Sequence, residues 1–489
     1  MQNKTRKGAV EKLATGIRGF DEVLEGGVPK GRSTLITGAT GTGKTVILNE
    51  FLYRGIIQFK ENGVYVTFEE DKKDIIKNVK NFGWNYNSLI AQKKLAFVDA
   101  GALKGVIFES GTNYDLSPLI ERVKYALKKV KAKRLVMDSI DSLFSRFQNK
   151  DAIRQALYQI VAELKDLGVT ALLSGEKVGE EKGLTRYGVE EFVADGAIEV
   201  ELIKGQQQFL RRMFVVKFRG IGFRSGIVEF EITDQGLVVY PKIPIERIVP
   251  KTDFKIRKAF GIKGLDEILG GGIPQGHMVL ISGNTGTGKT MFGMHFLTQG
   301  MNEGENAVFL ALEESVEQVK KTALVHGWDF NRYEKEGKIS FVSTSLIDMA
   351  NDKLLYQIVS AVECINAKRV VVDSISTLMS ATMNQEQVRQ FLLQLVGYFK
   401  RKGVTCVMNY LSPVSFGAVR GQLLSSLMTN EIRLSSITDG IIMLLFVERD
   451  QKIKKLLSVL KMRGSQHATE IFSFEIEKGG IKMGEKYKE

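Results

Sequence analysis

Two stretches of the chain carry glycine, lysine and threonine at the spacing GxxxxGK[ST]: GATGTGKT at residues 38–45 and GNTGTGKT at residues 283–290. In this pattern the glycines let consecutive backbone N–H groups wrap phosphates, the lysine places a charge on the β and γ groups, and the threonine hydroxyl ligates magnesium at a helix N-terminus. The motifs therefore predict two sites for ATP with Mg²⁺. The residues expected to form them are Gly38, Thr40, Gly41, Thr42, Gly43, Lys44 and Thr45, and Gly283, Thr285, Gly286, Thr287, Gly288, Lys289 and Thr290.

Acidic residues follow each motif at matching places. LVMDS and VVVDS put Asp138 and Asp373 at the ends of apolar runs, where a carboxylate can hold the water shell of Mg²⁺. A second set consists of adjacent glutamates that end the strand expected after the phosphate-loop helix; they are Glu69 and Glu70, and Glu313 and Glu314. At the C-terminal edge of a parallel sheet, one glutamate of each pair can act as a base on water or a hydroxyl beside the γ-phosphate. The alternative is a solvated pair at the start of a helix, stabilised by the helix dipole.

Two basic pairs occupy matching places near the end of each half. VVKFRG contains Lys217 and Arg219, and VLKMRG contains Lys461 and Arg463. Residues two apart on a strand share one face, and each pair lies far along the sequence from the phosphate loop of its own half. This placement suits cations that reach into the nucleotide site of a neighbouring subunit. Ordinary surface charge is the alternative interpretation.

The motifs recur because the chain contains two copies of one sequence unit in tandem. GFDEVLEGGVPKG from Gly19 recurs as GLDEILGGGIPQG from Gly264, 245 residues later, and the other motifs recur at almost the same offset. Such self-similarity indicates a tandem duplication. Pro244 and Pro250 interrupt regular structure at the join. We therefore expect two domains, at residues 1–245 and 246–489.

Within each half, short β-branched runs alternate with helical patterns. Strands are expected at residues 33–38, 64–68, 134–138 and 170–174, and at 278–283, 307–312, 369–373 and 405–409. Helices are expected at 45–59, 116–130, 152–167 and 290–301. This alternation predicts an α/β fold in which a mostly parallel sheet is covered by helices on both faces. Hairpin-like runs near the end of each half predict an antiparallel edge on each sheet.

Composition narrows the class of protein. The chain of 489 residues is longer than a single small domain. No stretch approaches the roughly 18 uncharged apolar residues of a membrane span. The first ten residues are polar and basic, so we expect no secretory signal and a cytoplasmic protein. Cys364 and Cys406 lack metal-ligand spacing and are expected to be reduced core residues. The net charge of +13 would suit a polyanionic partner, but most of the excess cations are scattered among acids, as on a solvated face.

Together these residues resemble the KaiC family, the tandem RecA-like ATPases of the circadian clock and their relatives in bacteria and archaea. The resemblance covers nearly the whole chain and includes YDLSPLIERVKYAL from Tyr114, TRYGVEEFVADG from Thr185 and SSITDGIIML from Ser435. It implies two tandem RecA-like P-loop NTPase domains in a two-tier homohexamer, with ATP between subunits. It also implies slow hydrolysis in the first tier and reversible autophosphorylation in the second. By motif, the glutamate pairs supply the base and the Lys–Arg pairs act in trans.

The second half differs from the first where the family carries its phosphoacceptors. Aligning the Asp-Gly pairs of the two halves puts Ser435 and Ser436 opposite Glu191 and Phe192, so only the second half offers two hydroxyls there. Ser436 stands where the best-known clock members have threonine. A phosphate would add about −1.5 to −2 charge at each site, beside cations. The resemblance therefore predicts phosphorylation of Ser435 and Ser436.

The sequence predicts a KaiC-like ATPase and serine/threonine autokinase that acts as a slow switch or timer. The family's long C-terminal extension has no counterpart after the last glycine pair, which argues against a KaiA partner, whereas a KaiB-like protein or a response-regulator system stays open. One alternative is a RecA-like or DnaB-like nucleic-acid motor, which would need a basic, aromatic or glycine-rich surface lining the ring. Another is a nucleotide-gated scaffold without significant phosphoryl transfer. Neither a nucleic-acid nor a membrane partner is expected.

Overall fold

The computed structural model describes residues 10–101, 109–110, 113–144, 147, 150–177, 193–204, 209–242, 253–344, 351–380, 385–412, 434, 436–449 and 451–488. The chain divides into two compact units, Met1–Lys242 and Ile243–Glu489, here called the first and second domains. No helix within the described ranges is long and apolar enough to cross a membrane.

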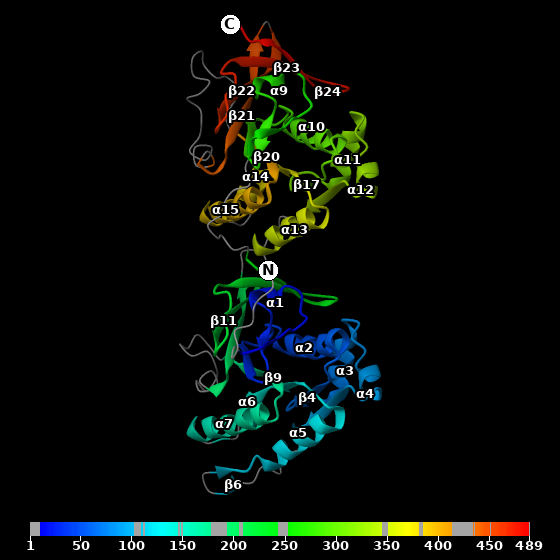
Figure 1. The fold of residues 1–489 in the computed structure, drawn as a ribbon, viewed down its shortest axis with the longest axis vertical. Coiled ribbons are helices and arrows are strands. Elements are labelled where there is room, and N and C mark those ends of the chain that lie inside the picture. Colours follow the sequence, from blue (N-terminus) through cyan, green and yellow to red (C-terminus); the bar gives the residue numbers. More distant parts are fainter. Residues whose placement is uncertain are drawn as a thin grey trace. The chain divides into compact units, whose positions relative to one another are not determined.

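A nine-stranded sheet forms the centre of the first domain (Figure 1). Its strands are β3 (Ser33–Gly38), β4 (Gly63–Thr67), β5 (Leu95–Asp99), β8 (Arg134–Asp138), β9 (Thr170–Glu176), β10 (Gly196–Lys204), β11 (Phe209–Phe218), β12 (Val228–Thr233) and β13 (Gly236–Tyr240). Their order is β13-β12-β11-β10-β3-β9-β8-β4-β5. The part from β10 to β5 is parallel, and β11, β12 and β13 continue it as an antiparallel edge.

Helices cover both faces of this sheet. They are α2 (Lys44–Phe59), α3 (Lys72–Lys80), α4 (Tyr86–Ala91), α5 (Ser117–Val130), α6 (Ile140–Phe144) and α7 (Lys150–Asp166). Successive strand residues point to opposite faces, so Leu35 packs into the core beneath α5 and α7 while Ile36 packs into the core beneath α2, α3 and α4. Both faces of β3 are therefore buried, which explains its uninterrupted apolar and β-branched sequence. Short elements complete the domain: β1 (Lys12–Leu13), β2 (Val28–Pro29), β6 (Glu109–Ser110), β7 (Asn113–Tyr114) and α1 (Phe20–Val23).

The second domain repeats this plan. Its strands are β16 (Met278–Gly283), β17 (Ala307–Ala311), β18 (Ile339–Ser343), β19 (Arg369–Asp373), β20 (Thr405–Leu411), β21 (Gly440–Arg449), β22 (Lys452–Met462), β23 (Ile471–Glu477) and β24 (Gly480–Lys486), with the short pair β14 (Asp253–Lys258) and β15 (Ile273–Gln275). Its helices are α9 (Leu265–Ile268), α10 (Lys289–Asn302), α11 (Val316–Val325), α12 (Phe330–Lys335), α13 (Asn351–Cys364), α14 (Ile375–Ser380) and α15 (Gln385–Lys402). The sheet order β18-β17-β19-β20-β16-β21-β22-β23-β24 matches the first domain strand for strand.

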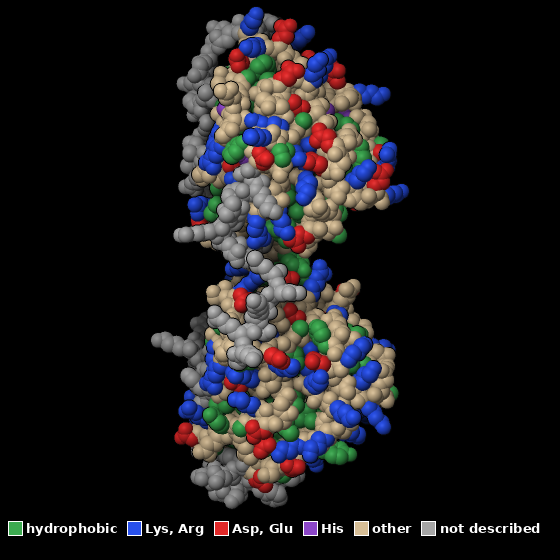
Figure 2. All heavy atoms as spheres, in the orientation of Figure 1, with side chains coloured by type: hydrophobic (Ala, Val, Ile, Leu, Met, Phe, Trp, Pro, Cys, Tyr) green, Lys and Arg blue, Asp and Glu red, His purple; other side chains and the backbone are tan. Residues whose placement is uncertain are grey.

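These two mixed sheets confirm the predicted fold class of tandem RecA-like α/β domains with antiparallel edges. One expectation is wrong: Cys364 is exposed at the end of α13, although Cys406 is buried as expected. On the face drawn in Figure 2, Lys and Arg side chains are interspersed with Asp and Glu in both domains. That face therefore shows mixed charge instead of one basic field.

Candidate nucleotide sites

The phosphate loop of the first domain joins the end of β3 to the start of α2. Gly41 and Gly43 have φ of 81° and 106°, in the left-handed region that favours glycine, and these turns fold the loop back over the helix N-terminus. The Lys44 ammonium lies across the loop and donates to the carbonyl oxygens of Gly38, at 2.7 Å, and Ala39, at 2.9 Å. Burial lowers the pKa of Lys44. The loop thus carries a partly desolvated cation above a helix N-terminus, which suits phosphate binding.

The second domain builds the same loop between β16 and α10. Lys289 donates to the carbonyl oxygens of Gly283, at 2.8 Å, and Asn284, at 2.9 Å. Its side chain is buried, and burial lowers its pKa as it does for Lys44. Gly286 and Gly288 have φ of 81° and 100°, almost the values of the first domain. The two motifs therefore fold into equivalent phosphate cradles.

Side chains whose oxygen atoms could ligate Mg²⁺ lie beside each loop. In the second domain Thr290 Oγ1 donates to Asp373 Oδ2 across 2.7 Å, and burial raises the pKa of Asp373. In the first domain Asp138 ends β8 and accepts a 2.9 Å hydrogen bond from the Tyr65 hydroxyl. Within the described ranges no cluster of three or more His, Cys, Asp or Glu could hold a metal ion. One hydroxyl and one carboxylate beside a phosphate cradle nevertheless fit Mg²⁺, which takes few protein ligands and completes its shell with water and phosphates.

A cleft of about 380 Å³ gathers the predicted residues of the first domain. Its lining includes Lys44 and Thr45 from α2, Asp138 from β8, and both Glu69 and Glu70. The glutamates arrive here because β4 pairs with β8, and the Phe68 amide donates to the Asp138 carbonyl oxygen at 3.1 Å. The sheet therefore brings the phosphate loop, an acid for Mg²⁺ and two candidate bases into one cleft.

The two glutamates have different partners. Glu69 is exposed and accepts a hydrogen bond from the Ser142 hydroxyl. Glu70 is half-buried and accepts a 2.7 Å hydrogen bond from the Asn78 amide, and burial together with Asp138 raises its pKa. In the second domain burial, Asp373 and Glu313 raise the pKa of Glu314. A raised pKa makes a carboxylate a stronger base, which favours proton abstraction by Glu70 and by Glu314, the second glutamate of each pair.

Sequence reasoning missed six residues that line the same cleft: Val46, Tyr65, Thr67, Ser139, Glu176 and Ile232. Glu176 lies at the end of β9, where it pairs in register with Gly38. The expected strand ends at Ser174, two residues too early, so the sequence pattern does not put Glu176 at a strand end. Ile232 comes from β12 in the antiparallel edge, far from the loop in sequence, and no local signal points to it.

The phosphate loops follow the C-terminal ends of the parallel strands, and the basic pairs lie toward the opposite, N-terminal ends of those strands. Lys217 pairs in register with Ala197, which itself pairs with Leu35 near the start of β3, whereas Lys44 follows the end of that strand. The described residues lining the cleft accordingly include neither Lys217 nor Arg219. Phe218, between them, is buried.

The second domain places its basic pair in the same way, beside the predicted phosphoacceptor Ser436. Lys461 donates to the Thr438 carbonyl oxygen at 3.0 Å, and Arg463 lies 3.7 Å from Asp439 and donates to the Ser436 carbonyl oxygen at 3.4 Å. Ser436 is exposed, and Ser435 lies outside the described residues. The Asp439 amide donates to the carbonyl oxygen of Met278, the first residue of β16. Ser436 therefore lies at the edge away from Lys289.

Comparison with known proteins shows similarity to one family over both halves of the chain. A family model described as "ATPase: KaiC" matches residues 13–243 and again residues 259–488. The chain is 35% identical to the circadian clock oscillator protein KaiC of Prochlorococcus marinus subsp. pastoris, over 99% of this chain and 93% of that protein. It is also 35% identical to the circadian clock oscillator protein KaiC of Synechococcus elongatus, over 98% of this chain and 90% of that protein.

Proposed function

The chain belongs to the KaiC family of ATPases, and from that premise we propose that it is an ATP-driven switch that phosphorylates itself. We assign ATP hydrolysis to residues 1–245, and ATP hydrolysis with serine/threonine autophosphorylation to residues 246–489. The observation that carries the proposal is the cleft in which Lys44, Asp138 and the pair Glu69–Glu70 meet. The matched loop of the second domain extends the proposal to both halves.

Each residue has a distinct task in phosphoryl transfer. Lys44 and Lys289 place positive charge on the β- and γ-phosphates, and the loop N–H groups cradle them. Thr45 with Asp138, and Thr290 with Asp373, would hold Mg²⁺, which neutralises charge that develops on the phosphates. In the first domain one glutamate of the pair Glu69–Glu70 takes a proton from water as the water oxygen bonds to the γ-phosphorus, the bond from that phosphorus to the β-phosphate oxygen breaks, and ADP leaves.

In the second domain the acceptor is a serine hydroxyl instead of water. The Oγ of Ser435 or Ser436 forms a bond to the γ-phosphorus, the bond from that phosphorus to the β-phosphate oxygen breaks, and ADP leaves. The hydroxyl proton passes to the carboxylate of Glu313 or Glu314. Run in reverse, the same step returns the phosphoryl group to ADP.

Assembly is part of the proposal because Ser436 lies far from the phosphate loop of its own domain. Ser436 and Arg463 lie at the edge of the sheet where β16 begins, and Lys289 lies beyond the edge where β16 ends. A strand rises about 3.3 Å per residue, so the length of β16 separates the acceptor from its own phosphate loop. In an oligomer, Ser436, Lys461 and Arg463 of a neighbouring subunit could instead reach the nucleotide site. We therefore propose a homohexamer with ATP at subunit interfaces.

Phosphosite mass spectrometry tests the proposal directly. Incubation of the chain with Mg-ATP should yield phosphate on Ser435 or Ser436, and the Glu313→Gln and Lys289→Ala variants should lack it. Light scattering with ATP should report hexamers. ATP binding and hydrolysis without added phosphate over hours would favour a nucleotide-gated scaffold, and monomers in ATP would overturn the roles in trans.

A further inference from the structure

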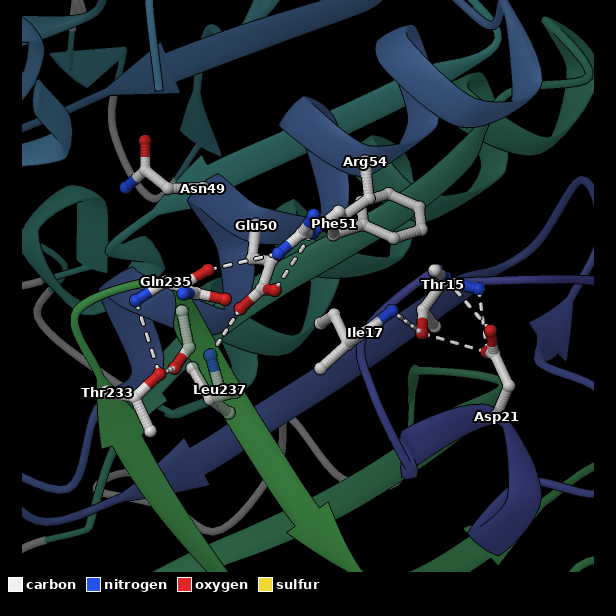
Figure 3. Close-up of polar contacts among 12 residues, drawn as sticks. Thr15, Ile17, Asp21, Asn49, Glu50, Phe51, Arg54, Thr233, Gln235 and Leu237 are labelled. Carbon is white, nitrogen blue, oxygen red and sulfur yellow. Dashed lines mark hydrogen bonds and ion pairs between the residues drawn. The ribbon is translucent and has the colours of Figure 1, made fainter. Parts of the chain in front are cut away.

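The phosphate-loop helix is tied to the antiparallel hairpin by one buried carboxylate. Glu50 lies on α2 six positions after Lys44, and its side chain is 0% exposed. Its Oε2 accepts a 2.6 Å hydrogen bond from the backbone N–H of Leu237, and its Oε1 accepts a 3.1 Å bond from Arg54 Nε (Figure 3). Arg54 in turn donates to the carbonyl oxygen of Gln235 at 3.0 Å. Two residues of α2 thus hold the turn between β12 and β13.

The turn fits tightly against this carboxylate. Gly236 has φ of 118°, and a Cβ added to it would lie 2.5 Å from Glu50 Oε2. The Thr233 hydroxyl donates to the Gly236 carbonyl oxygen at 2.9 Å, which closes the turn on itself. Burial raises the pKa of Glu50, while the bonds from Leu237 and Arg54 act against that shift. Removal of the carboxylate would leave a buried backbone N–H without its acceptor.

The same hairpin contacts the phosphate loop. Ile232, on β12, lies against Gly43, where an added Cβ would come within 2.8 Å of Ile232 Cδ1. Ile232 also lines the cleft beside Lys44 and Thr45. The hairpin therefore forms one wall of the nucleotide site, and Glu50 fixes the helix and the hairpin relative to each other.

The second domain makes the same connection with different chemistry. His295 lies six positions after Lys289, and its Nε2 accepts a 2.8 Å hydrogen bond from the Ile481 N–H on β24. A Cβ on Gly480 would lie 2.1 Å from that nitrogen, and a Cβ on Gly288 would lie 2.7 Å from Ile476 Cδ1. A carboxylate in one domain and an imidazole in the other thus serve as the acceptor for the same backbone position. The repeated feature is the tie between helix and hairpin, not the residue type.

We propose that Glu50 and His295 are positioning residues that set the ATP affinity of their domains. Each holds its hairpin against the phosphate loop and acts through the hairpin isoleucine, without being part of the phosphate cradle. The inference rests on the proposed ATP-dependent function, because it concerns the site in which that nucleotide would bind. It goes beyond that function by assigning affinity to a contact outside the phosphate-binding motif.

The test isolates the first site with Lys289→Ala in the full chain and compares Glu50→Ala with Glu50→Gln. Calorimetric titration with a non-hydrolysable ATP analogue should give a dissociation constant raised about tenfold by Glu50→Ala, equivalent to roughly 1.4 kcal/mol. Glu50→Gln should stay within about twofold of the parent, because its amide oxygen still accepts from Leu237. With ATP itself, KM should follow the same order, and kcat at saturation should change far less.

Glu61→Ala is the matched control. It removes a carboxylate that ion-pairs with buried Arg134 at 2.7 Å, in the same domain but away from the hairpin, so it should lower stability without changing the dissociation constant. Equal dissociation constants for Glu50→Ala and Glu61→Ala would overturn the inference. Should Glu50→Ala fail to fold, Gly236→Ala displaces the hairpin from the other side and should weaken binding likewise. A parent that binds the analogue but hydrolyses no ATP contradicts the proposed function, while the dissociation constants still decide the inference.

Discussion

Thr290 Oγ1 lies 2.7 Å from Asp373 Oδ2, so a hydroxyl and a buried carboxylate meet at the start of the helix that follows the second phosphate loop. The bond shows that the two side chains reach the same point from neighbouring parts of the fold, α10 and β19. A shared position of hard oxygen ligands is what Mg²⁺ binding with phosphates requires. Under the proposed function, Asp373 would orient water around that ion.

Asp373→Asn should therefore weaken the response to Mg²⁺ more than it weakens ATP binding. Loss of a carboxylate that orients metal-bound water typically costs about 10–100-fold in metal affinity. The measurement is a Mg²⁺ titration of phosphate incorporation at fixed ATP, read as the concentration for half-maximal rate. Glu475→Gln, an exposed residue of β23, is the control and should keep the parent value. An unchanged Mg²⁺ requirement in Asp373→Asn would show that the carboxylate has another task.

Each phosphate-loop lysine should account for one nucleotide per chain. Lys44→Ala and Lys289→Ala each remove the charge that spans one loop, so equilibrium dialysis should show one ATP per chain for each variant and two for the parent. Lys482→Ala removes an exposed lysine from β24 and should still bind two. Two nucleotides per chain in either loop variant would contradict the assignment of that lysine.

A mixing experiment tests whether the basic pairs act in trans. Lys289→Ala lacks a working phosphate loop and Arg463→Ala lacks the cation at the opposite edge, so each protein alone should fail to phosphorylate Ser435 or Ser436. After subunit exchange in an equal mixture, about one quarter of the head-to-tail interfaces should join an intact phosphate loop from one subunit to an intact Arg463 from its neighbour. Phosphorylation should be recovered at those interfaces. Recovery is measured as phosphate per chain. A mixture as inactive as its components would rule against a shared site.

The sequence was most informative where a local pattern and its chemistry coincide. Strands β3 and β16 have the predicted bounds because a short apolar run, buried on both faces, ends directly at a glycine loop. The acids at strand ends could be placed near the loops because the carboxyl ends of parallel strands share one edge. Strand β5 was missed: its LAFVD sequence is short and partly exposed at the edge of the sheet, so its pattern is weak.

Contacts between distant segments could not be predicted from one sequence. Glu50 lies among helix residues, and only the fold shows that its acceptor role is directed at Leu237, 187 positions later. Ile232 reaches Gly43 for the same reason, because the antiparallel strands β11 and β12 carry the chain back over the loop. Repetition of the motifs predicted two equivalent sites, but it gave no indication that glutamate and histidine would take equivalent places.

Buried Arg369 should be a major contributor to the stability of the second domain. It ion-pairs with Glu305 at 2.7 Å, donates to the carbonyl oxygens of Ala259 and Phe296, and lies over the Phe296 ring. Arg369→Met removes the donor that Glu303, Glu305 and two carbonyl oxygens share, which should cost about 3–5 kcal/mol in the free energy of unfolding. Urea denaturation measures it.

Arg332→Met is the control for that substitution, since its ion pair with Glu336 is on the surface and should change stability little. The first domain carries the counterpart Arg134, which pairs with Glu61 and donates to the carbonyl oxygens of Ala14 and Phe51. Arg134→Met should therefore destabilise the first domain similarly. Equal stability of Arg369→Met and Arg332→Met would show that packing alone holds these segments.

The tie between α10 and β24 should make the second domain sensitive to mild acid. His295 must be neutral to accept from Ile481, and burial, with the neighbouring His326, lowers the pKa of His295 from 6.5 to about 4. Above pH 6.5 folded and unfolded states are both neutral, and stability is complete. As pH falls from 6.5 towards 4, the His295 imidazole binds a proton in the unfolded state but stays neutral in the folded state, so stability declines.

Between pH 7 and pH 5 this loss should be about 2 kcal/mol, because the unfolded imidazole becomes protonated over that range while the folded one stays mostly neutral. Trp328, whose ring lies 4.6 Å from that of His295, reports unfolding of the second domain once Trp84→Phe has removed the other tryptophan. In that background His295→Gln should reduce the dependence, because its amide oxygen accepts from Ile481 at every pH, while buried His277, whose pKa burial also lowers, keeps its own share. His467→Gln should keep the full dependence. If His295→Gln retained the full loss between pH 7 and pH 5, the acid sensitivity would have to originate elsewhere, and the neutral imidazole would not be what holds the hairpin to α10.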